Sequence, residues 1–276
     1  MSKKRMIALD ADYLIFMCTE GKDVTNRGLF GSESGSVNSK KKKKYKESLK
    51  PFKDKFKRLV SEVEDEIAAT MVGEVKGIKV ILSDSRSNFR YDMYPEYKGE
   101  RPKRSELFYR LRKWAEKKYP YVENVEADDV VGYLVGKKNW IGASMDKDLL
   151  RGVSGDWFNV HHLHRSFITT APLEAANFNF IQTLMGDPVD NIKALPKKAG
   201  TLMIPVPNLP KGKRQPFKVT EKLAIELLEE FGWDWNGVVA AFESKGFGKK
   251  EALLNRRLID MLQWTPKRGV KLWLPN

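Results

Sequence analysis

The sequence predicts an α/β fold: a mostly parallel sheet with flanking helices, followed by a helical second part. Two observations favour this class. Short apolar runs alternate with helical patterns through residues 1–171, and helical patterns dominate over residues 172–276. We therefore expect an α/β region over 1–171 and a helical subdomain over 172–276, whose C-terminal segment can return to the first region.

Four strands are expected, because short apolar runs end at turn residues or acids. They cover Arg5–Asp10, Gly77–Ser83, Asn139–Ser144 and residues 156–161. Helices are expected from the basic run Lys40–Arg58 to near Val72, over Arg101–Lys118, over Glu126–Val135 and over Asn177–Met185. The proline-rich segment 205–216 reads as a basic loop.

Composition sets the class of protein. The chain has 276 residues and is 41% hydrophobic, which suffices for a buried core. Its single cysteine excludes an internal disulfide and fits a reducing compartment, so we expect a cytoplasmic protein. No apolar run approaches the roughly 20 residues of a membrane span, and Asp10 and Asp12 interrupt the first apolar stretch. Neither a membrane protein nor a signal peptide is expected.

The charge points to a polyanionic partner. Lys and Arg total 50 against 36 Asp and Glu, so the formal charge is +14, and nucleic acid is favoured over a membrane surface. The acids are clustered, however. A positive exterior around an acidic pocket is typical of enzymes that cut or join phosphodiesters.

Acids follow the expected strands directly. The carboxyl ends of parallel strands share one sheet edge, so Asp10, Asp84 and Asp146 can converge there. Further acids open a helix or lie on turns, and the full set of candidates is Asp10, Asp84, Glu126, Asp128, Asp129, Asp146, Asp148, Asp187 and Asp190. Such a set needs counter-charge. Oxygen-only ligands select hard cations, Mg²⁺ or Mn²⁺, and two ions about 4 Å apart suit phosphoryl displacement.

Each acid taken singly has a simpler interpretation. An acid after a strand is often a turn residue or a helix N-cap. The prediction of a metal site therefore depends on the whole set.

The motifs occur in an order that resembles a known family. They are IALD at Asp10, LSDSRSNFR at residues 82–90, PEYKGER at 95–101, VEADD at 125–129, SMDKDL at 144–149 and MGDPVDNI at 185–192. Together they resemble the flap endonuclease and 5′-3′ exonuclease family, bacteriophage branch. The resemblance covers residues 6 to about 195, with a weaker likeness at the C-terminus.

The resemblance implies a PIN-like α/β domain with a helix–three-turn–helix region that grips duplex DNA. It implies metal-dependent hydrolysis near 5′ ends of duplex or branched DNA, with RNA in RNA–DNA hybrids as a further substrate, by a monomer. One ion is then held by Asp84, Glu126 and Asp128, with Asp10 acting partly through water. Asp146, Asp148 and Asp187 hold the other ion, with Asp129 and Asp190 nearby.

The basic residues also receive roles. Lys98 and Arg101 match the catalytic basic pair at the foot of an arch that covers about 97–125, and Tyr97 is expected to stack on a terminal base. The resulting set of candidate nucleic-acid contacts is Arg90, Tyr97, Lys98, Arg101, Lys197, Lys198, Lys211, Lys213 and Arg214.

Two departures from the family pattern bear on mechanism. Only 27 residues separate Lys98 from Glu126, since 126 − 98 − 1 = 27, which is short for a closed arch that threads a strand. The segment after Asn191 lacks the usual Gly-x-Gly hairpin, so its binding of phosphate and K⁺ is less assured.

Two other functions stay open. A haloacid-dehalogenase-type phosphatase would use Asp10 as a covalent nucleophile, but its last motif should follow a strand where Asn177–Met185 predicts a helix. A non-catalytic nucleic-acid-binding protein would explain the basic runs and leave the acids without a role. Dependence of cleavage on Mg²⁺ separates both from a nuclease.

Overall fold

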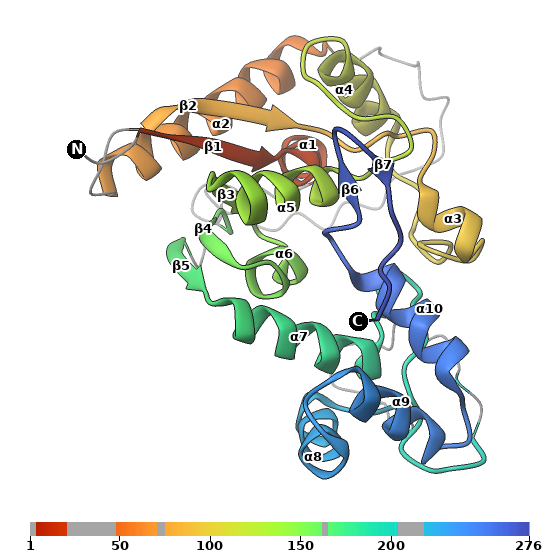
Figure 1. Cartoon of the computed structure of the whole chain (residues 1–276). Helices are drawn as coiled ribbons and strands as arrows, with labels where there is room; N and C mark the ends of the chain where they lie inside the picture. The colour runs from red at the N-terminus through yellow and green to blue at the C-terminus, as the bar shows by residue number, and fades with distance from the viewer. Residues whose placement is uncertain are drawn as a thin grey trace, which may run out of the picture.

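A five-stranded sheet forms the centre of the first region (Figure 1). The computed structural model describes residues 4–20, 48–70, 75–161, 165–201, 203 and 218–275. The strand order is β2-β1-β3-β4-β5, and the strands are β1 (Arg5–Asp10), β2 (Val75–Ile81), β3 (Ile141–Ser144), β4 (Gly155–Asn159) and β5 (Ser166–Thr170). All neighbours pair in parallel except β4 with β5. The predicted class, an α/β fold with a mostly parallel sheet, is confirmed.

The sheet is buried on both faces, because alternate strand residues enter two different cores. Ile7 and Leu9 pack among α1 (Asp12–Thr19), α2 (Lys50–Thr70) and α4 (Glu106–Glu116). Ala8, between them, faces a second core built with α5 (Ala127–Lys138) and α6 (Lys147–Gly152). The helices on the two faces fix the strands in register, so the carboxyl ends of β1, β2 and β3 lie along one edge.

The second region is helical. Four helices, α7 (Pro172–Met185), α8 (Glu221–Phe231), α9 (Trp235–Glu243) and α10 (Lys249–Ile259), enclose a core of their own with Leu195 and Val219. Pro172 starts α7, where a missing N–H costs nothing. Because α7 occupies the place at which the phosphatase alternative requires a strand, the structure speaks against that alternative.

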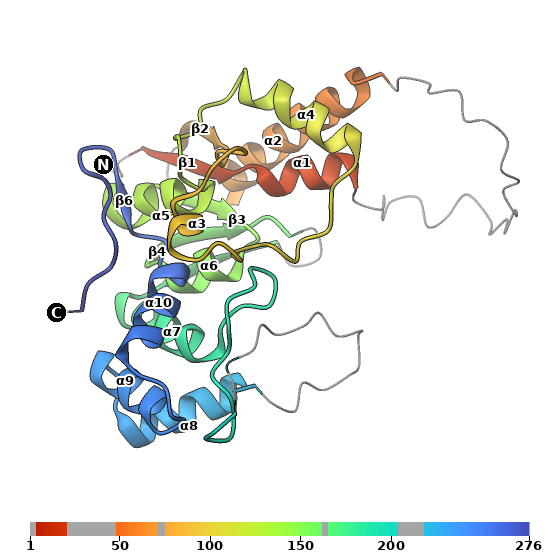
Figure 2. The same ribbon diagram turned by 90° about the vertical axis from the view of Figure 1, so that its right-hand side faces the viewer.

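The C-terminal segment returns to the α/β region. A hairpin of β6 (Trp264–Thr265) and β7 (Gly269–Val270) lies beside α5 in both views of the ribbon (Figures 1 and 2). The Trp264 ring meets the Tyr133 ring edge-on at 5.7 Å. This contact joins the two regions behind the sheet.

The helix expected over Arg101–Lys118 is shorter than predicted. Helix α4 begins after Ser105, whose Oγ accepts the Phe108 N–H as an N-cap. Pro102 and the residues around it form a loop instead. Leu111 and Ala115 are buried against α1 and α2, and Figure 2 shows α4 beside these helices. The segment therefore packs on the α/β region as a wall.

One strand of the sheet was not expected from the sequence. Strand β5 was not predicted, because SFITT alternates weakly and belongs to an antiparallel edge strand. No helix among the described residues is long and apolar enough to span a membrane.

Candidate active site

A pocket of about 920 Å³ lies at the carboxyl ends of β1, β2 and β3. Asp10 is the last residue of β1, and Asp84 and Asp146 follow β2 and β3 within three residues. All the carboxylates in the predicted set line this pocket except Asp129. Convergence at the sheet edge, the central expectation from the sequence, is therefore what the structure shows.

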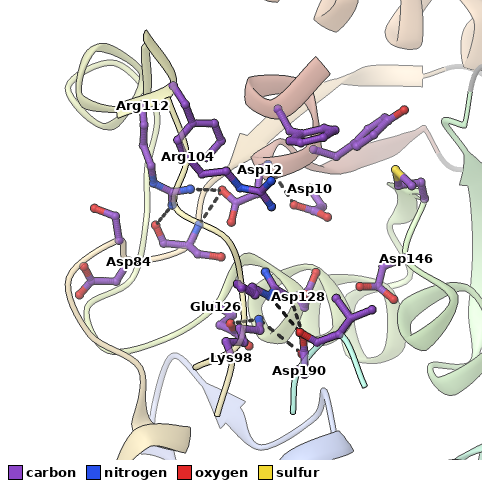
Figure 3. Close-up of a pocket in the computed structure, with 18 of the residues that line it drawn as sticks. Asp10, Asp12, Asp84, Lys98, Arg104, Arg112, Glu126, Asp128, Asp146 and Asp190 are labelled. Atoms are coloured by element: carbon purple, nitrogen blue, oxygen red, sulfur yellow. Dashed lines mark hydrogen bonds and ion pairs between the residues drawn. The ribbon is translucent and has the colours of Figure 1, made fainter. Parts of the chain in front are cut away.

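Three carboxylates at the centre of the pocket have no cationic partner within the described part of the chain. They are Asp10, Asp128 and Asp146 (Figure 3). Asp10 accepts hydrogen bonds from the Asp12 N–H and the Ser144 hydroxyl, each at 3.2 Å. Asp146 caps α6 by accepting the Asp148 N–H at 2.8 Å. These bonds orient the carboxylates and leave their negative charge unbalanced.

Burial and mutual repulsion shift the protonation of these groups. Burial, together with the charges of Asp12 and Asp146, raises the pKa of Asp10 to about 7. Burial and the charges of Asp10 and Asp146 raise the pKa of Asp128 well above its usual range. Burial also raises the pKa of Asp146. A positive charge placed among them would lower all three.

On one side of the pocket, Lys98 neutralises Glu126 and Asp190. The Lys98 ammonium is in ion-pair contact with Glu126 and lies 3.6 Å from Asp190 Oδ2. Although burial lowers the pKa of Lys98, these two carboxylates outweigh it and raise the value. The pKa of Glu126 is lowered, because Lys98 and Arg90 outweigh the effect of burial. Glu126 is therefore ionised and fixed.

The turn that carries Asp190 is fastened to the segment that carries Lys98. The Lys98 N–H donates to the Asp190 carbonyl at 2.9 Å, and Lys98 adopts a left-handed φ of 56°. Arg101 forms an ion pair with Asp190 and keeps a side chain that is 40% exposed. A left-handed non-glycine residue is held only by such surrounding contacts. The predicted basic pair thus lies at the pocket, with Arg101 the more accessible member.

A second lysine that lines the pocket, Lys147, contacts Asp148 and Asp187. Its ammonium lies 3.2 Å from Asp187 Oδ2 and 3.9 Å from Asp148 Oδ1. Sequence reasoning treated Lys147 only as the spacer of the Asp146-x-Asp148 pair. Its position between two acids was the signal that could have identified it.

Asp129 and Arg90 pair with each other, away from the pocket. Both side chains are fully buried, and Arg90 donates to the two oxygens of Asp129 at 2.7 and 2.9 Å. Arg90 also donates to the Leu258 and Asp260 carbonyls, both at 2.9 Å. Through these contacts both residues join α5 to the end of α10. The roles expected for Asp129 in metal binding and for Arg90 in DNA binding stay predictions.

Tyr97 is also internal. It is 1% exposed, and its hydroxyl lies 3.0 Å from Glu126 and 2.9 Å from Asp190. A side chain in this position orients two carboxylates, and its ring is buried. The expected stacking on a terminal base stays a prediction.

Asp84 lies at the rim of the pocket and serves its own loop. It accepts the Asn124 and Arg86 N–H groups and the Ser87 hydroxyl at 2.9–3.0 Å. These bonds outweigh burial and lower the pKa of Asp84 to about 2. Figure 3 shows Asp84 on the opposite side of the pocket from Asp146. Its oxygens are thus largely occupied by donors of the chain.

A second neutralised acid was missed by sequence reasoning. Arg112 Nη1 lies 3.1 Å from Asp12, and its Nη2 donates to the Ser83 carbonyl at 2.7 Å. This buried arginine ties α4 to the ends of β1 and β2. The position of Arg112, directly after the buried Leu111 in α4, was the feature of the sequence that could have indicated a buried arginine.

The remaining predicted DNA contacts lie in the second region. Lys198 is exposed and Lys197 is half-buried in the segment between α7 and α8. Lys211, Lys213 and Arg214 fall outside the described residues.

The donors of the pocket fit a hard divalent cation. All are carboxylate oxygens, and the central three have no counter-charge from the described chain. Within those same residues, no three Asp, Glu, His or Cys side chains already gather around one point as a metal-binding group. Lys98 and Lys147 explain part of this absence. Each lies between two carboxylates, and these carboxylates could otherwise come together around an ion.

Comparison with known proteins finds similarity to nucleases. No protein-family model matches it. It is 32% identical over 143 residues to a 5′-3′ exonuclease of Buchnera aphidicola from Acyrthosiphon pisum, covering 45% of this chain and 49% of that protein. It is 28% identical over 206 residues to DNA polymerase I of Bacillus caldotenax, covering 66% of this chain and 21% of that protein. The chain thus spans about half the length of the exonuclease and a fifth of the polymerase.

Solved structures from bacteriophage T5 share the fold. A flap endonuclease in complex with DNA and metal ions has a TM-score of 0.58 at 18% identity, covering 94% of this chain and 90% of that chain. A 5′-exonuclease with bound zinc has a TM-score of 0.59 at 19% identity, with the same coverage. At this level of identity the likeness concerns the fold, which both T5 proteins share with this chain. The chain is thus similar in sequence to a 5′-3′ exonuclease over about half of that protein, and it shares the fold of the T5 nucleases.

Proposed function

We propose that the chain is a divalent-metal-dependent 5′-nuclease that hydrolyses phosphodiester bonds at or near 5′ ends of duplex or branched DNA. The observation that carries the proposal is the central trio Asp10, Asp128 and Asp146, which has no cationic partner among the described residues and faces the pocket. The net charge of +14 favours a nucleic-acid substrate.

Two hard ions, Mg²⁺ or Mn²⁺, are the proposed cofactors. Asp10, Asp128 and Asp146 would hold one with Glu126, and Asp148 and Asp187 would hold the other. When bound, such ions supply a water of lowered pKa and stabilise charge on the phosphate oxygens. A K⁺ site in the segment after Asn191, action on RNA–DNA hybrids and a monomeric state belong to the same proposal.

The chain's own residues supply the positioning. Lys98 and Tyr97 hold Glu126 in a single orientation, and Glu126 stays ionised as a result. Arg101, which is 40% exposed, is placed to clasp a phosphate with two N–H groups. The helical subdomain and the basic Lys40–Arg58 run provide the grip on the duplex, so binding should weaken steeply with salt.

The test is cleavage of 5′-labelled nicked, flap and blunt duplexes by wild type, Asp128→Asn and the control Asp92→Asn. Asp92 is exposed on α3 (Phe89–Met93) and does not line the pocket. We expect Asp128→Asn to abolish cleavage in Mg²⁺ while retaining duplex binding in EDTA, and Asp92→Asn to behave as wild type. Cleavage by wild type in EDTA, or near-normal cleavage by Asp128→Asn, would contradict the proposal.

The same experiment separates the alternatives. A non-catalytic binding protein would hold the duplex and release no labelled product in Mg²⁺. A phosphatase with Asp10 as nucleophile would remove the terminal label as inorganic phosphate and leave the strand length unchanged. A nuclease releases nucleotides or oligonucleotides.

A further inference from the structure

Lys147 lies between two carboxylates of the pocket that come from separate parts of the chain. Asp148 belongs to the first turn of α6, and Asp187 lies on the turn after α7. The ammonium is 3.2 Å from Asp187 Oδ2 and 3.9 Å from Asp148 Oδ1. We propose that Lys147 is a built-in counter-ion of this carboxylate pair and that it must withdraw when a divalent ion binds there. The inference rests on the proposed function.

Each carboxylate is anchored independently of Lys147. Asp187 Oδ1 accepts the Val189 N–H at 2.7 Å and the Asp190 N–H at 3.3 Å. Asp148 Oδ1 accepts the Gln182 Nε2 group at 3.0 Å. Their positions are thus set by the turn and by α7, and the pair persists if the lysine moves. What the lysine provides is positive charge.

That charge is needed because the pair is acidic and poorly hydrated. The side chains of Asp148 and Asp187 are only 11% and 6% exposed. Without a cation, two nearby carboxylates repel each other. The Lys147 ammonium, within 4 Å of both, offsets this repulsion.

Lys147 can move into solvent, whereas Lys98 is held in the pocket. The Lys147 side chain is 53% exposed, against 14% for Lys98. Lys98 is further held by the face of Tyr97, whose ring centroid lies 4.9 Å from the ammonium. A half-exposed lysine can rotate its long chain into solvent at low cost. The two lysines thus differ in kind: Lys98 is a fixed element of the pocket, and Lys147 is a replaceable one.

A replaceable ammonium competes with a divalent ion for the same oxygens. Its charge lowers the affinity of the Asp148–Asp187 pair for that ion, which makes this pair the weaker of the two sites. Replacing Lys147 by the neutral and similarly shaped methionine should tighten ion binding at this pair by about tenfold or more, because a unit charge within 4 Å acts strongly near a protein surface.

The experiment compares Lys147→Met with Lys222→Met in the full chain. Lys222 is 88% exposed on α8 and makes a surface pair with Glu226 at 3.8 Å, so this control removes one positive charge far from the pocket. Mn²⁺ binding is measured by titration calorimetry, and Tm is measured in EDTA and in saturating Mn²⁺. DNA cleavage by wild type is measured in parallel.

We expect Lys147→Met to bind its weaker Mn²⁺ about tenfold more tightly, to have a lower Tm in EDTA, and to gain more Tm from Mn²⁺ than wild type. Lys222→Met should match wild type in each measurement. If wild type binds Mn²⁺ and cuts DNA, yet both variants have the same affinities and Tm values, the inference is overturned and the proposed function stands. If wild type neither binds Mn²⁺ nor cuts DNA, the proposed function fails and the inference with it.

Discussion

Arg90 offers a sharp test of how the pocket is supported, because one fully buried guanidinium connects three elements. It donates to both oxygens of Asp129 on α5 and to the carbonyls of Leu258 and Asp260 at the end of α10. It also reaches Glu126 Oε2 at 3.4 Å. Replacing Arg90 by methionine keeps much of the volume but leaves Asp129 buried without a cation. Removing one partner of a buried ion pair costs about 3–5 kcal/mol.

The assay is urea unfolding of Arg90→Met, Asp129→Leu and the double variant at pH 7. We expect Arg90→Met to lose about 3–5 kcal/mol of the free energy of unfolding. The double variant should lose clearly less than the sum of the single losses, because neither charge is then left unpaired. The conservative Arg90→Lys should also be destabilised, since one ammonium cannot satisfy a forked set of acceptors.

A loss below about 1 kcal/mol in Arg90→Met would refute the reasoning, because it would place the pair in the range of exposed ion pairs. Additive losses in the double variant would refute it equally. A second measurement, hydrogen exchange at α10, should show faster exchange in Arg90→Met near Leu258, where the guanidinium holds the end of the helix.

Three further outcomes are expected. Asp156 accepts hydrogen bonds from Thr169 and Arg5, which outweigh partial burial and lower its pKa. Asp156→Asn should therefore cost roughly 0.2–1 kcal/mol at pH 7. Because the folded-state pKa is lowered, the difference from wild type in urea melts should be complete above about pH 4 and be lost as the pH falls further, through the folded-state pKa. Burial raises the pKa of the Cys18 thiol to about 12, so a disulfide reagent at pH 8 should modify it only after unfolding, and rapid reaction of the native chain would contradict this. The short segment between Lys98 and Glu126 should not enclose a strand, so streptavidin on a 5′-biotinylated flap should leave cleavage unchanged, whereas blockage only when it is added before the enzyme would indicate threading.

The sheet and the pocket could be predicted because they depend on local patterns. An apolar run followed by an acid marks the end of a buried strand, and parallel strands bring such ends to one edge. Asp10, Asp84 and Asp146 needed nothing else to be assigned there. The start of α4 was harder to predict, because the basic pattern continued back to Arg101. The helix begins only after Ser105, which caps it.

The sequence does not show which acidic side chains lack an ion-pair partner, because the basic partners come from distant positions in the chain. Arg90 is 39 residues from Asp129, and nothing in VEADD distinguishes Asp129 from Asp128 as the acid that receives it. On the helix the two point in different directions, and the packing of α3 and α10 decides which direction is covered. Sequence reasoning therefore assigned all nine acids to metal binding, including Asp129, which forms an ion pair with Arg90 in the structure.

The distribution of cations around the pocket has a physical consequence for folding. Carboxylates from β1, α5 and α6 meet at one edge, and their repulsion opposes the folded state. Lys98 and Lys147 reduce this repulsion for the acids that they contact. The central trio keeps it, and burial together with neighbouring carboxylates raises the pKa of Asp10. A lysine or arginine beside the trio would increase the stability of the folded chain, but it would also occupy the place that a bound cation needs. Any cation that binds the trio adds this stability instead, so binding and stability are coupled at this point.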